Sequence, residues 1–268
     1  MAAAISAHES SPPRETEYLS PPAVVSMTDG YFELAFLDHF WVVRRFEVFR
    51  KLAGHLVANA HQMVEVGCGQ GVLQRQIEEA YGRKITGFDL NESGLRHNLS
   101  KLSRVCCYDI YQREPAFKER FDLIFLWDVI EHIRDEDGFL RAVLFHLAPA
   151  GKLVVNVPAG EWAFSGYDRA AGHVRRYSAR SLQETARRNK LEIVCWSYWG
   201  LPLVPTVAVR KLWLMGKGDS RKAYSTGFGV RAKSINRALR LLSKWEAIPQ
   251  KLLGTPLMAI VQSKARGE

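Results

Sequence analysis

The stretch Val64-Glu65-Val66-Gly67-Cys68-Gly69-Gln70-Gly71 runs from a strand-like segment into a glycine-rich turn. Glycines allow positive φ angles and let the backbone approach a ligand closely. The dinucleotide-binding fingerprint has the related spacing GxGxxG, with the pyrophosphate at the N-terminus of the following helix. Here the third glycine comes one residue early, and Val72 stands at the last position of that fingerprint. The turn therefore predicts a nucleotide-like cofactor and disfavours an NAD-dependent oxidoreductase.

Short strand-like runs alternate with amphipathic stretches on both sides of this turn. The strand-like runs lie at 62–66, 84–89, 105–108, 121–127, 151–157, 191–199 and 258–262, and the amphipathic stretches at 72–81, 92–101, 136–147 and 181–189. This rhythm is typical of an α/β fold in which helices cover both faces of a parallel sheet.

The composition is that of an ordinary globular protein. The chain has 268 residues, of which 47% are hydrophobic and 24% charged, so collagen-like, low-complexity and wholly disordered classes are excluded. A chain of this length can bury about 75% of its extended surface in one core. We expect a disordered leader at 1–26, a core domain at 27–199, a helical insertion at 200–255, and a last strand with a tail at 256–268.

The connection before the last strand is far longer than the usual 2 to 6 residues of α/β units. It carries an apolar run at 201–215, followed by a basic amphipathic helix with the apolar stripe Ile235, Ala238, Leu239, Leu242 and Trp245. Residues 1–150 hold 16 Lys and Arg against 21 Asp and Glu, whereas residues 151–268 hold 21 against 7. We expect this insertion to be a lid over the substrate. Contact with an anionic membrane, or a merely solvated basic surface, remains an alternative.

Acidic residues stand at the predicted carboxyl ends of the strands, where open α/β sheets bind their ligands. Asp89 follows the strand after the glycine turn and is placed to accept the hydroxyl hydrogens of a ribose. Asp109 ends the next strand, at the level of an adenine, although it could equally cap a helix. Asp128-Val129-Ile130-Glu131-His132 follows the very apolar run at 121–127.

A second group of chemically active side chains is the stretch Gly172-His173-Val174-Arg175-Arg176-Tyr177. Arginine suits carboxylate or phosphate groups, and histidine can take a proton near neutral pH. If the nucleophile must lose a proton, His173 is the first candidate for the base and His132 the second. The structural alternatives are a capping histidine and arginines that cover an acidic surface.

The glycine turn EVGCGQG, the acidic Asp89, FDLIFLWDVIEH and GKLVVNVP together resemble class I S-adenosylmethionine-dependent methyltransferases, the group that includes ubiquinone-biosynthesis O-methyltransferases. The resemblance covers about residues 30–199. It implies a Rossmann-like, doubly wound, seven-stranded sheet whose last strand is antiparallel. It also implies that the glycines line the methionine part of the cofactor, that Asp89 holds the ribose, and that Asp109 and Ile110 flank the adenine, with Asp128 and Val129 at the sulfonium. The expected cofactor-binding set is Arg45, Glu65, Gly67, Cys68, Gly69, Gly71, Asp89, Leu90, Asp109, Ile110, Asp128 and Val129.

Two further segments resemble a bacterial group from polysaccharide and secondary-metabolite pathways. His39-Phe40-Trp41-Val42-Val43-Arg44-Arg45 is similar to its HWWFxxR entry helix, with Phe40 where the group usually has Trp, and residues 168–177 are similar to its DxxxGHxRRY segment. The match implies that Arg45 contacts the cofactor carboxylate. The predicted substrate-binding residues are Trp162, Asp168, Arg176 and Tyr177, and the predicted catalytic residues are His173 and His132.

The expected activity is methyl transfer from S-adenosylmethionine to oxygen or nitrogen of a small, anionic or partly apolar acceptor, with S-adenosylhomocysteine as product. The alternative acceptor is a lipid-linked intermediate at a membrane surface. Nucleic acid is disfavoured as a substrate, because the residues after the fourth strand are Trp127-Asp128-Val129-Ile130 and no RNA-binding module is visible. A non-catalytic protein of the same fold is disfavoured by the intact glycine turn.

The four cysteines form no pair of CxxC motifs, so neither a zinc site nor a disulfide framework is indicated, and no metal site is predicted. The sequence shows no signal-peptide pattern and no uninterrupted run of about 18 apolar residues. It therefore predicts a reduced, cytoplasmic protein.

Overall fold

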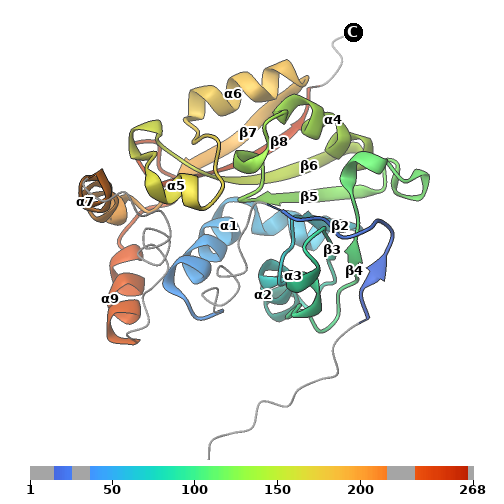
Figure 1. The fold of residues 1–268 in the computed structure, drawn as a ribbon, viewed down its shortest axis with the longest axis horizontal. Coiled ribbons are helices and arrows are strands. Elements are labelled where there is room, and N and C mark those ends of the chain that lie inside the picture. The colour runs from blue at the N-terminus through green and yellow to red at the C-terminus, as the bar shows by residue number, and fades with distance from the viewer. Residues whose placement is uncertain (1–14, 26–36, 216–232, 265–268) are drawn as a thin grey trace, which may run out of the picture.

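The computed structural model describes residues 15–25, 37–215 and 233–264. Its centre is an eight-stranded sheet of order β1-β4-β3-β2-β5-β6-β8-β7 (Figure 1). The strands are β1 Glu17–Tyr18, β2 Met63–Val66, β3 Thr86–Asp89, β4 Val105–Cys107, β5 Phe121–Trp127, β6 Leu147–Pro158, β7 Leu191–Tyr198 and β8 Pro256–Ser263. Pairs from β1 to β6 are parallel, whereas β8 is antiparallel to both β6 and β7. The expected antiparallel last strand is therefore confirmed.

Helices cover both faces of the sheet, with α4 and α6 on one face and α1 and α2 on the other (Figure 1). The α-helices are α1 Phe40–Asn59, α2 Val72–Tyr81, α3 Glu92–Arg96, α4 Glu136–His146, α5 Gly166–Ala170, α6 Ala179–Arg188, α7 Val204–Met215 and α9 Lys233–Ser243. Short 3-10 helices are η2 Ile110–Gln112, η3 Pro115–Phe117, η4 Ile130–His132, η5 Glu161–Ala163 and η6 Leu201–Leu203.

The alternation of side chains along β5 divides the core into two layers. Leu123, Phe125 and Trp127 pack in the cluster under α1 and α2, whereas Ile124 and Leu126 pack in the cluster under α4 and α6. Successive side chains of a strand point to opposite faces, so a strand buried on both faces is apolar throughout. This is why 121–127 is apolar at every position except Asp122.

The eighth strand corrects two predictions, the seven-stranded sheet and, for residues 15–25, the disordered leader. Glu17 and Tyr18 pair in parallel with Cys106 and Cys107 of β4. Glu17 also accepts from the Arg104 guanidinium at 2.7 Å. Two strand residues are too few to show a period of two, and the prolines around them mask the signal. Residues 1–14 and 26 lie outside the described residues.

Between β7 and β8 the described residues form η6, α7 and α9. The amide of Asn236 in α9 accepts from the backbone N–H of Phe40 at 2.7 Å. The carboxylate of Glu246 accepts from the backbone N–H groups of Gly200 and Leu201, at 2.9 Å each. These contacts attach α9 and the chain after it to the start of α1 and the end of β7, on the side of the sheet away from β4 (Figure 1). The role of this segment as a lid stays a prediction.

Candidate active site at the carboxyl ends of the strands

The glycine turn adopts the backbone that only glycine takes without strain. The φ angles of Gly67, Gly69 and Gly71 are 80°, 50° and 70°. A Cβ atom on Gly67 would lie 2.6 Å from Cγ2 of Val129. The turn after β2 and the turn after β5 therefore pack directly against each other, and the side chain of Val129 occupies the space beside Gly67.

Asp89, at the end of β3, is bound to this turn. Its Oδ2 accepts from the backbone N–H of Gly69 at 2.7 Å, and its Oδ1 accepts from that of Asn91 at 2.8 Å. Burial raises the pKa of the Asp89 carboxyl, and the backbone donors oppose that rise. Cys68 is buried in the turn, and Leu90 packs against the small cluster that contains Cys68. The structure thus brings the predicted turn and the predicted acidic residue together.

Asp109 and Ile110 lie one strand further out, after β4. The Asp109 carboxylate caps η2 by accepting from the backbone N–H of Tyr111 at 2.9 Å, which is the structural alternative foreseen for it. The Ile110 side chain lies in the core, so only its backbone remains for contact with an adenine. No pattern in the sequence pointed to Ser20, whose hydroxyl accepts from the backbone N–H of Asp109 at 2.8 Å.

Asp128, directly after β5, is the centre of a polar network. Its backbone is left-handed, with φ 55°. Arg45 from α1 lies with Nη1 2.5 Å from Asp128 Oδ2, and Asn156 Nδ2 donates to Oδ1 at 2.8 Å. Asn156 is held in turn by the indole N–H of Trp199 at 3.0 Å. The network ties α1, β5, β6 and the end of β7 together. Arg45 is paired with Asp128 in it, and its contact with the cofactor carboxylate stays a prediction.

A third carboxylate, Glu65, is buried between Asp89 and Asp128. Burial raises the pKa of the Glu65 carboxyl well above its usual value; Arg45 opposes this rise, whereas Asp89 and Asp128 add to it. Its Oε2 has no hydrogen-bond partner within the described residues. The ends of β2, β3 and β5 therefore bring three carboxyl groups together, of which Asp128 is paired with Arg45 and Glu65 keeps one oxygen without a partner.

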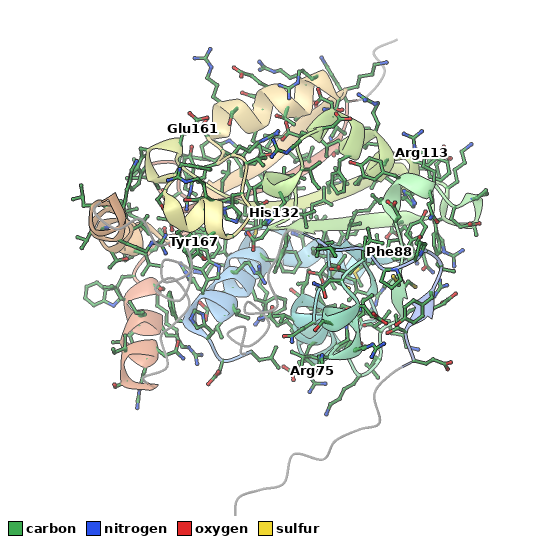
Figure 2. The ribbon with its side chains drawn as sticks, viewed as in Figure 1. Arg75, Phe88, Arg113, His132, Glu161 and Tyr167 are labelled. Atoms are coloured by element: carbon green, nitrogen blue, oxygen red, sulfur yellow. The ribbon has the colours of Figure 1, made fainter. Side chains whose placement is uncertain are left out.

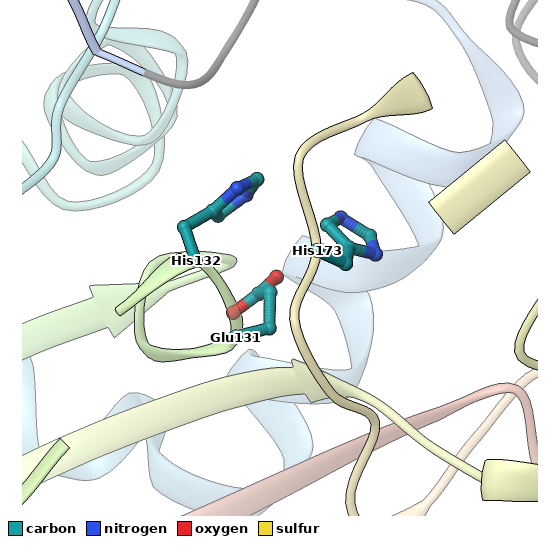
Figure 3. Close-up of side chains that lie close together, drawn as sticks. All are labelled: Glu131, His132 and His173. Carbon is teal, nitrogen blue, oxygen red and sulfur yellow. The ribbon is translucent and has the colours of Figure 1, made fainter. Parts of the chain in front are cut away.

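The turn after β5 also presents Glu131 and His132, which meet His173 from the loop after α5 (Figure 3). The two imidazole centroids are 4.8 Å apart. Burial, followed by repulsion from His173, lowers the pKa of His132 to about 4. Burial and the charge of Asp128 raise the pKa of the Glu131 carboxyl well above its usual range. The structure brings the two predicted catalytic histidines together.

Asp168 holds His173 in place. Its Oδ1 accepts from His173 Nδ1 at 3.0 Å and from Arg176 Nε at 2.7 Å. These donors keep the pKa of the Asp168 carboxyl below its usual value although burial opposes them. Asp168 and Arg176 are both buried, so they support His173 from within the protein rather than lining an open surface.

Tyr177 requires a correction, because it lies in the core and does not face a substrate. Its exposed fraction is 2%, and its hydroxyl donates to Glu136 Oε1 at 2.5 Å. The phenol fills the apolar layer between the sheet and α4, and the buried Glu136 satisfies its hydroxyl. The aromatic ring therefore stabilises the fold next to the site.

Trp162 is the predicted substrate residue that is exposed, to 40%. The ammonium of Lys211, from α7, donates to its backbone carbonyl. Nearby on α7, the Arg210 guanidinium lies over the ring of Tyr167 at 4.2 Å and forms no ion pair within the described part of the chain. Tyr167 and His132, both labelled in Figure 2, come from α5 and η4. Sequence reasoning missed Arg210, because it lies within an apolar run.

The sheet order and the glycine turn followed by an acidic strand end define a class I methyltransferase fold. The chain belongs to the methyltransferase domain family, whose family model matches residues 41–195, more than half of the chain. A solved structure, a SAM dependent methyltransferase from Archaeoglobus fulgidus, has the same fold with a TM-score of 0.55 and 16% identity, covering 87% of this chain and 97% of that one.

Curated relatives match the same core. A protein of Mycobacterium tuberculosis H37Rv named as a probable S-adenosylmethionine-dependent methyltransferase is 29% identical over 51% of this chain and 50% of its own length. A ubiquinone biosynthesis O-methyltransferase of Bradyrhizobium is 27% identical over 47% and 51%. A tRNA U34 carboxymethyltransferase of Campylobacter curvus is 30% identical over 48% and 46%. The chain thus spans about half the length of the curated relatives it matches. Within the described residues, no helix is long and apolar enough to cross a membrane.

Proposed function

We propose that this protein is an enzyme that transfers the methyl group of S-adenosylmethionine to oxygen or nitrogen of a small acceptor. The observation that carries the proposal is the contact between Asp89 Oδ2 and the backbone N–H of Gly69 at 2.7 Å, which joins the acidic strand end to the glycine turn. The family membership supports the cofactor. The carboxyl groups of Glu65 and Asp128 at the neighbouring strand ends lie beside this contact.

The chemistry requires little from the protein besides positioning. A lone pair of the acceptor attacks the methyl carbon, the bond from that carbon to sulfur breaks, and S-adenosylhomocysteine leaves. An acceptor hydroxyl also loses its proton. The imidazole of His173 is the candidate to take this proton. Asp168 holds its Nδ1, which leaves Nε2 to accept the proton from the acceptor hydroxyl.

An anionic acceptor is supported by Arg210. Burial lowers the pKa of its guanidinium, and the side chain is packed on Tyr167 rather than paired with a carboxylate. A partly buried cation without a counterion is favourable where a carboxylate or phosphate of the acceptor completes it. Trp162, exposed on the same side, offers an apolar ring to the rest of the molecule.

The test is label transfer from methyl-labelled S-adenosylmethionine to a host extract divided into aqueous small molecules, lipids and macromolecules. Asp89→Ala is the variant with weakened cofactor binding and Glu114→Gln, at an exposed position, is the matched surface control. We expect label in the aqueous fraction that depends on Asp89. If S-adenosylhomocysteine does not bind the wild-type protein in a calorimetric titration, the proposal is wrong whatever the extract contains.

A second candidate acceptor, a lipid-linked intermediate, is favoured by the exposed face of α7, α9 and the segment after α9. Trp245, Leu252 and Leu212 are exposed to 88%, 82% and 70%. Large apolar side chains next to basic residues are typical of surfaces that bind anionic membranes. Basic residues of α9 and of the segment after it include Arg237, Arg240, Lys244 and Lys251.

Cosedimentation with vesicles tests this candidate. We expect binding to anionic vesicles that weakens with salt and with the double substitution Trp245→Gln and Leu212→Gln. The control Leu102→Gln, at an exposed apolar residue outside this face, should bind as wild type. Equal binding by the double variant, or no binding to anionic vesicles, rejects the lipid surface.

A further inference from the structure

Glu131 is a buried carboxyl group without a hydrogen-bond partner. Its exposed fraction is 0%, and neither Oε1 nor Oε2 has a hydrogen-bond partner within the described residues. Buried polar side chains in proteins are hydrogen-bonded, paired with a charge or coordinated to a metal. Both oxygens of Glu131 are therefore available to a ligand that the structure does not contain.

The charges around Glu131 lead to the same conclusion. Asp128 is paired with Arg45 at 2.5 Å, and Asp168 is paired with Arg176 at 2.7 Å. The two guanidinium groups whose charge acts on Glu131 are therefore each bound to another carboxylate. Glu131 forms no ion pair among the described side chains.

Two imidazoles complete a set of metal ligands beside this carboxylate. One ligand atom each from Glu131, His132 and His173 lies within 4.8 Å of the others, and Figure 3 shows the three side chains together. Ligands on one zinc ion at about 2.0–2.2 Å lie up to about 4 Å apart, so small side-chain rotations bring the set onto one ion. The backbone N–H of Val174 donates to the carbonyl of Glu131 at 2.8 Å, which holds the two segments in register.

The surroundings of His173 are those of a metal-binding histidine. Metal-ligating histidines almost always donate their second ring N–H to a carboxylate, carbonyl or water. His173 Nδ1 lies 3.0 Å from Asp168 Oδ1, which leaves Nε2 as the ligand atom. Asp168 is itself fixed by the backbone N–H of Ser165 at 2.9 Å and by Arg176. These contacts fix the orientation of the imidazole before an ion binds.

We propose that Glu131, His132 and His173 bind one divalent transition-metal ion. Two imidazole nitrogens and one carboxylate oxygen suit Zn²⁺, Fe²⁺, Mn²⁺ or Co²⁺ better than Ca²⁺ or Mg²⁺. Three protein ligands leave at least one coordination position for water or for an oxygen of the acceptor. When the ion is bound, the Nε2 atom of His173 is one of its ligands and cannot also accept a proton. The ion, rather than this imidazole, would then promote loss of the proton from an acceptor hydroxyl. The inference concerns the same site as the proposed function but does not depend on methyl transfer.

The experiment is a titration of tag-free, chelator-treated protein with Co²⁺ and Zn²⁺, followed by absorption and calorimetry. We expect one ion per chain and a Co²⁺ spectrum with d–d bands but without thiolate charge-transfer bands. The variants Glu131→Gln, His132→Gln and His173→Gln should each lose the stoichiometric site, and Asp168→Asn should weaken it by about 10- to 100-fold. His55→Gln, an exposed histidine on α1, is the matched control and should bind as wild type.

Three outcomes overturn the proposal: no stoichiometric binding to the wild-type protein, unchanged binding by all three ligand variants, or a thiolate spectrum. Folding of each variant is checked by its thermal midpoint without metal, and metal should raise that midpoint in wild type and His55→Gln but not in the ligand variants. S-adenosylhomocysteine binding, measured in parallel, separates the two hypotheses. Cofactor binding without metal binding rejects only the metal site, and metal binding without cofactor binding rejects only the proposed function.

Discussion

Arg45 Nη1 lies 2.5 Å from Asp128 Oδ2, so a side chain of α1 is bound directly to the turn after β5. The side chain of Arg45 is 7% exposed and that of Asp128 29%. The guanidinium also lies over the Trp127 ring at 4.8 Å from its centroid. A helix that precedes the sheet in the chain thus sets the position of a residue at the centre of the site.

Replacing Arg45 by Met should lower the free energy of unfolding. Loss of one partner of a buried ion pair costs about 3–5 kcal/mol, and we expect the lower end because Asp128 is partly solvated. Urea unfolding measures the change. The control Arg96→Met removes an exposed pair with Glu92 and should change the stability by less than about 1 kcal/mol. Equal effects of the two substitutions would show that the buried pair has no special structural role.

Replacing Asp89 by Ala should weaken the binding of S-adenosylhomocysteine. Hydrogen bonds to a charged group contribute about 1.5–3 kcal/mol, and the Gly69 backbone loses its acceptor as well. Calorimetric titration at constant salt measures the change. Glu92→Gln, close by at the start of α3, should bind as wild type. An unchanged dissociation constant for Asp89→Ala would contradict the ribose role.

Replacing Gly67 by Ala should destabilise the turn for two separable reasons. Left-handed backbone costs about 1–2 kcal/mol for a residue with a Cβ, and that atom would overlap Val129 Cγ2 at 2.6 Å, an overpacking penalty of about 1–3 kcal/mol. In a protein that already carries Val129→Ala, the same Gly67→Ala substitution should lower the free energy of unfolding only by the backbone contribution. Denaturant unfolding of the four proteins of this cycle measures both parts. An identical loss in both backgrounds would rule out the steric contact.

Replacing Tyr177 by Phe should affect stability but not cofactor affinity. The hydroxyl donates to the buried Glu136, and removing one partner of a buried hydrogen bond costs about 1–3 kcal/mol. Tyr111→Phe, at a ring that is 48% exposed, should remain within about 0.5 kcal/mol of wild type. A Tyr177→Phe protein with normal stability and lost turnover would restore the substrate role that the structure argues against.

Stability should fall as the pH decreases below the usual pKa of histidine, in part because of His146. Burial lowers the pKa of His146 from 6.5. Its neutral ring accepts from the Tyr108 hydroxyl at Nε2 and donates to the Ala142 carbonyl at Nδ1, at 2.9 and 2.8 Å. Below pH 6.5 the unfolded chain binds this proton before the folded one does, so the free energy of unfolding decreases with falling pH.

The variant His146→Gln keeps a donor and an acceptor but cannot be protonated. Its free energy of unfolding should change less than that of wild type between about pH 8 and about pH 5. Other buried histidines, such as His39, whose pKa is also lowered by burial, retain part of the slope. The control His97→Gln alters an exposed imidazole and should leave the slope unchanged. An unaltered slope in His146→Gln would refute the assignment.

The parts of the site that depend on local spacing were predictable. Asp89 follows a strand next to the glycine turn, and parallel neighbours end at the same edge, so their contact follows from the order of the elements. Tyr177 was not predictable, because a side chain four residues from His173 can point either to the site or to the core. Only the packing of α4, which carries Glu136, decided that it points inward.

The alternation of strands and helices, the glycine turn and the acidic strand ends were determined by the sequence itself, because each depends on residues that are neighbours in the chain. The tertiary structure alone decided that Glu17 and Tyr18 form an eighth strand, since two residues pair only where a partner strand is offered. It alone brought His173 to Glu131 and His132, which α4, β6 and α5 separate in the chain. No local sequence pattern predicts that these side chains come close together, because their proximity depends on how the intervening elements pack.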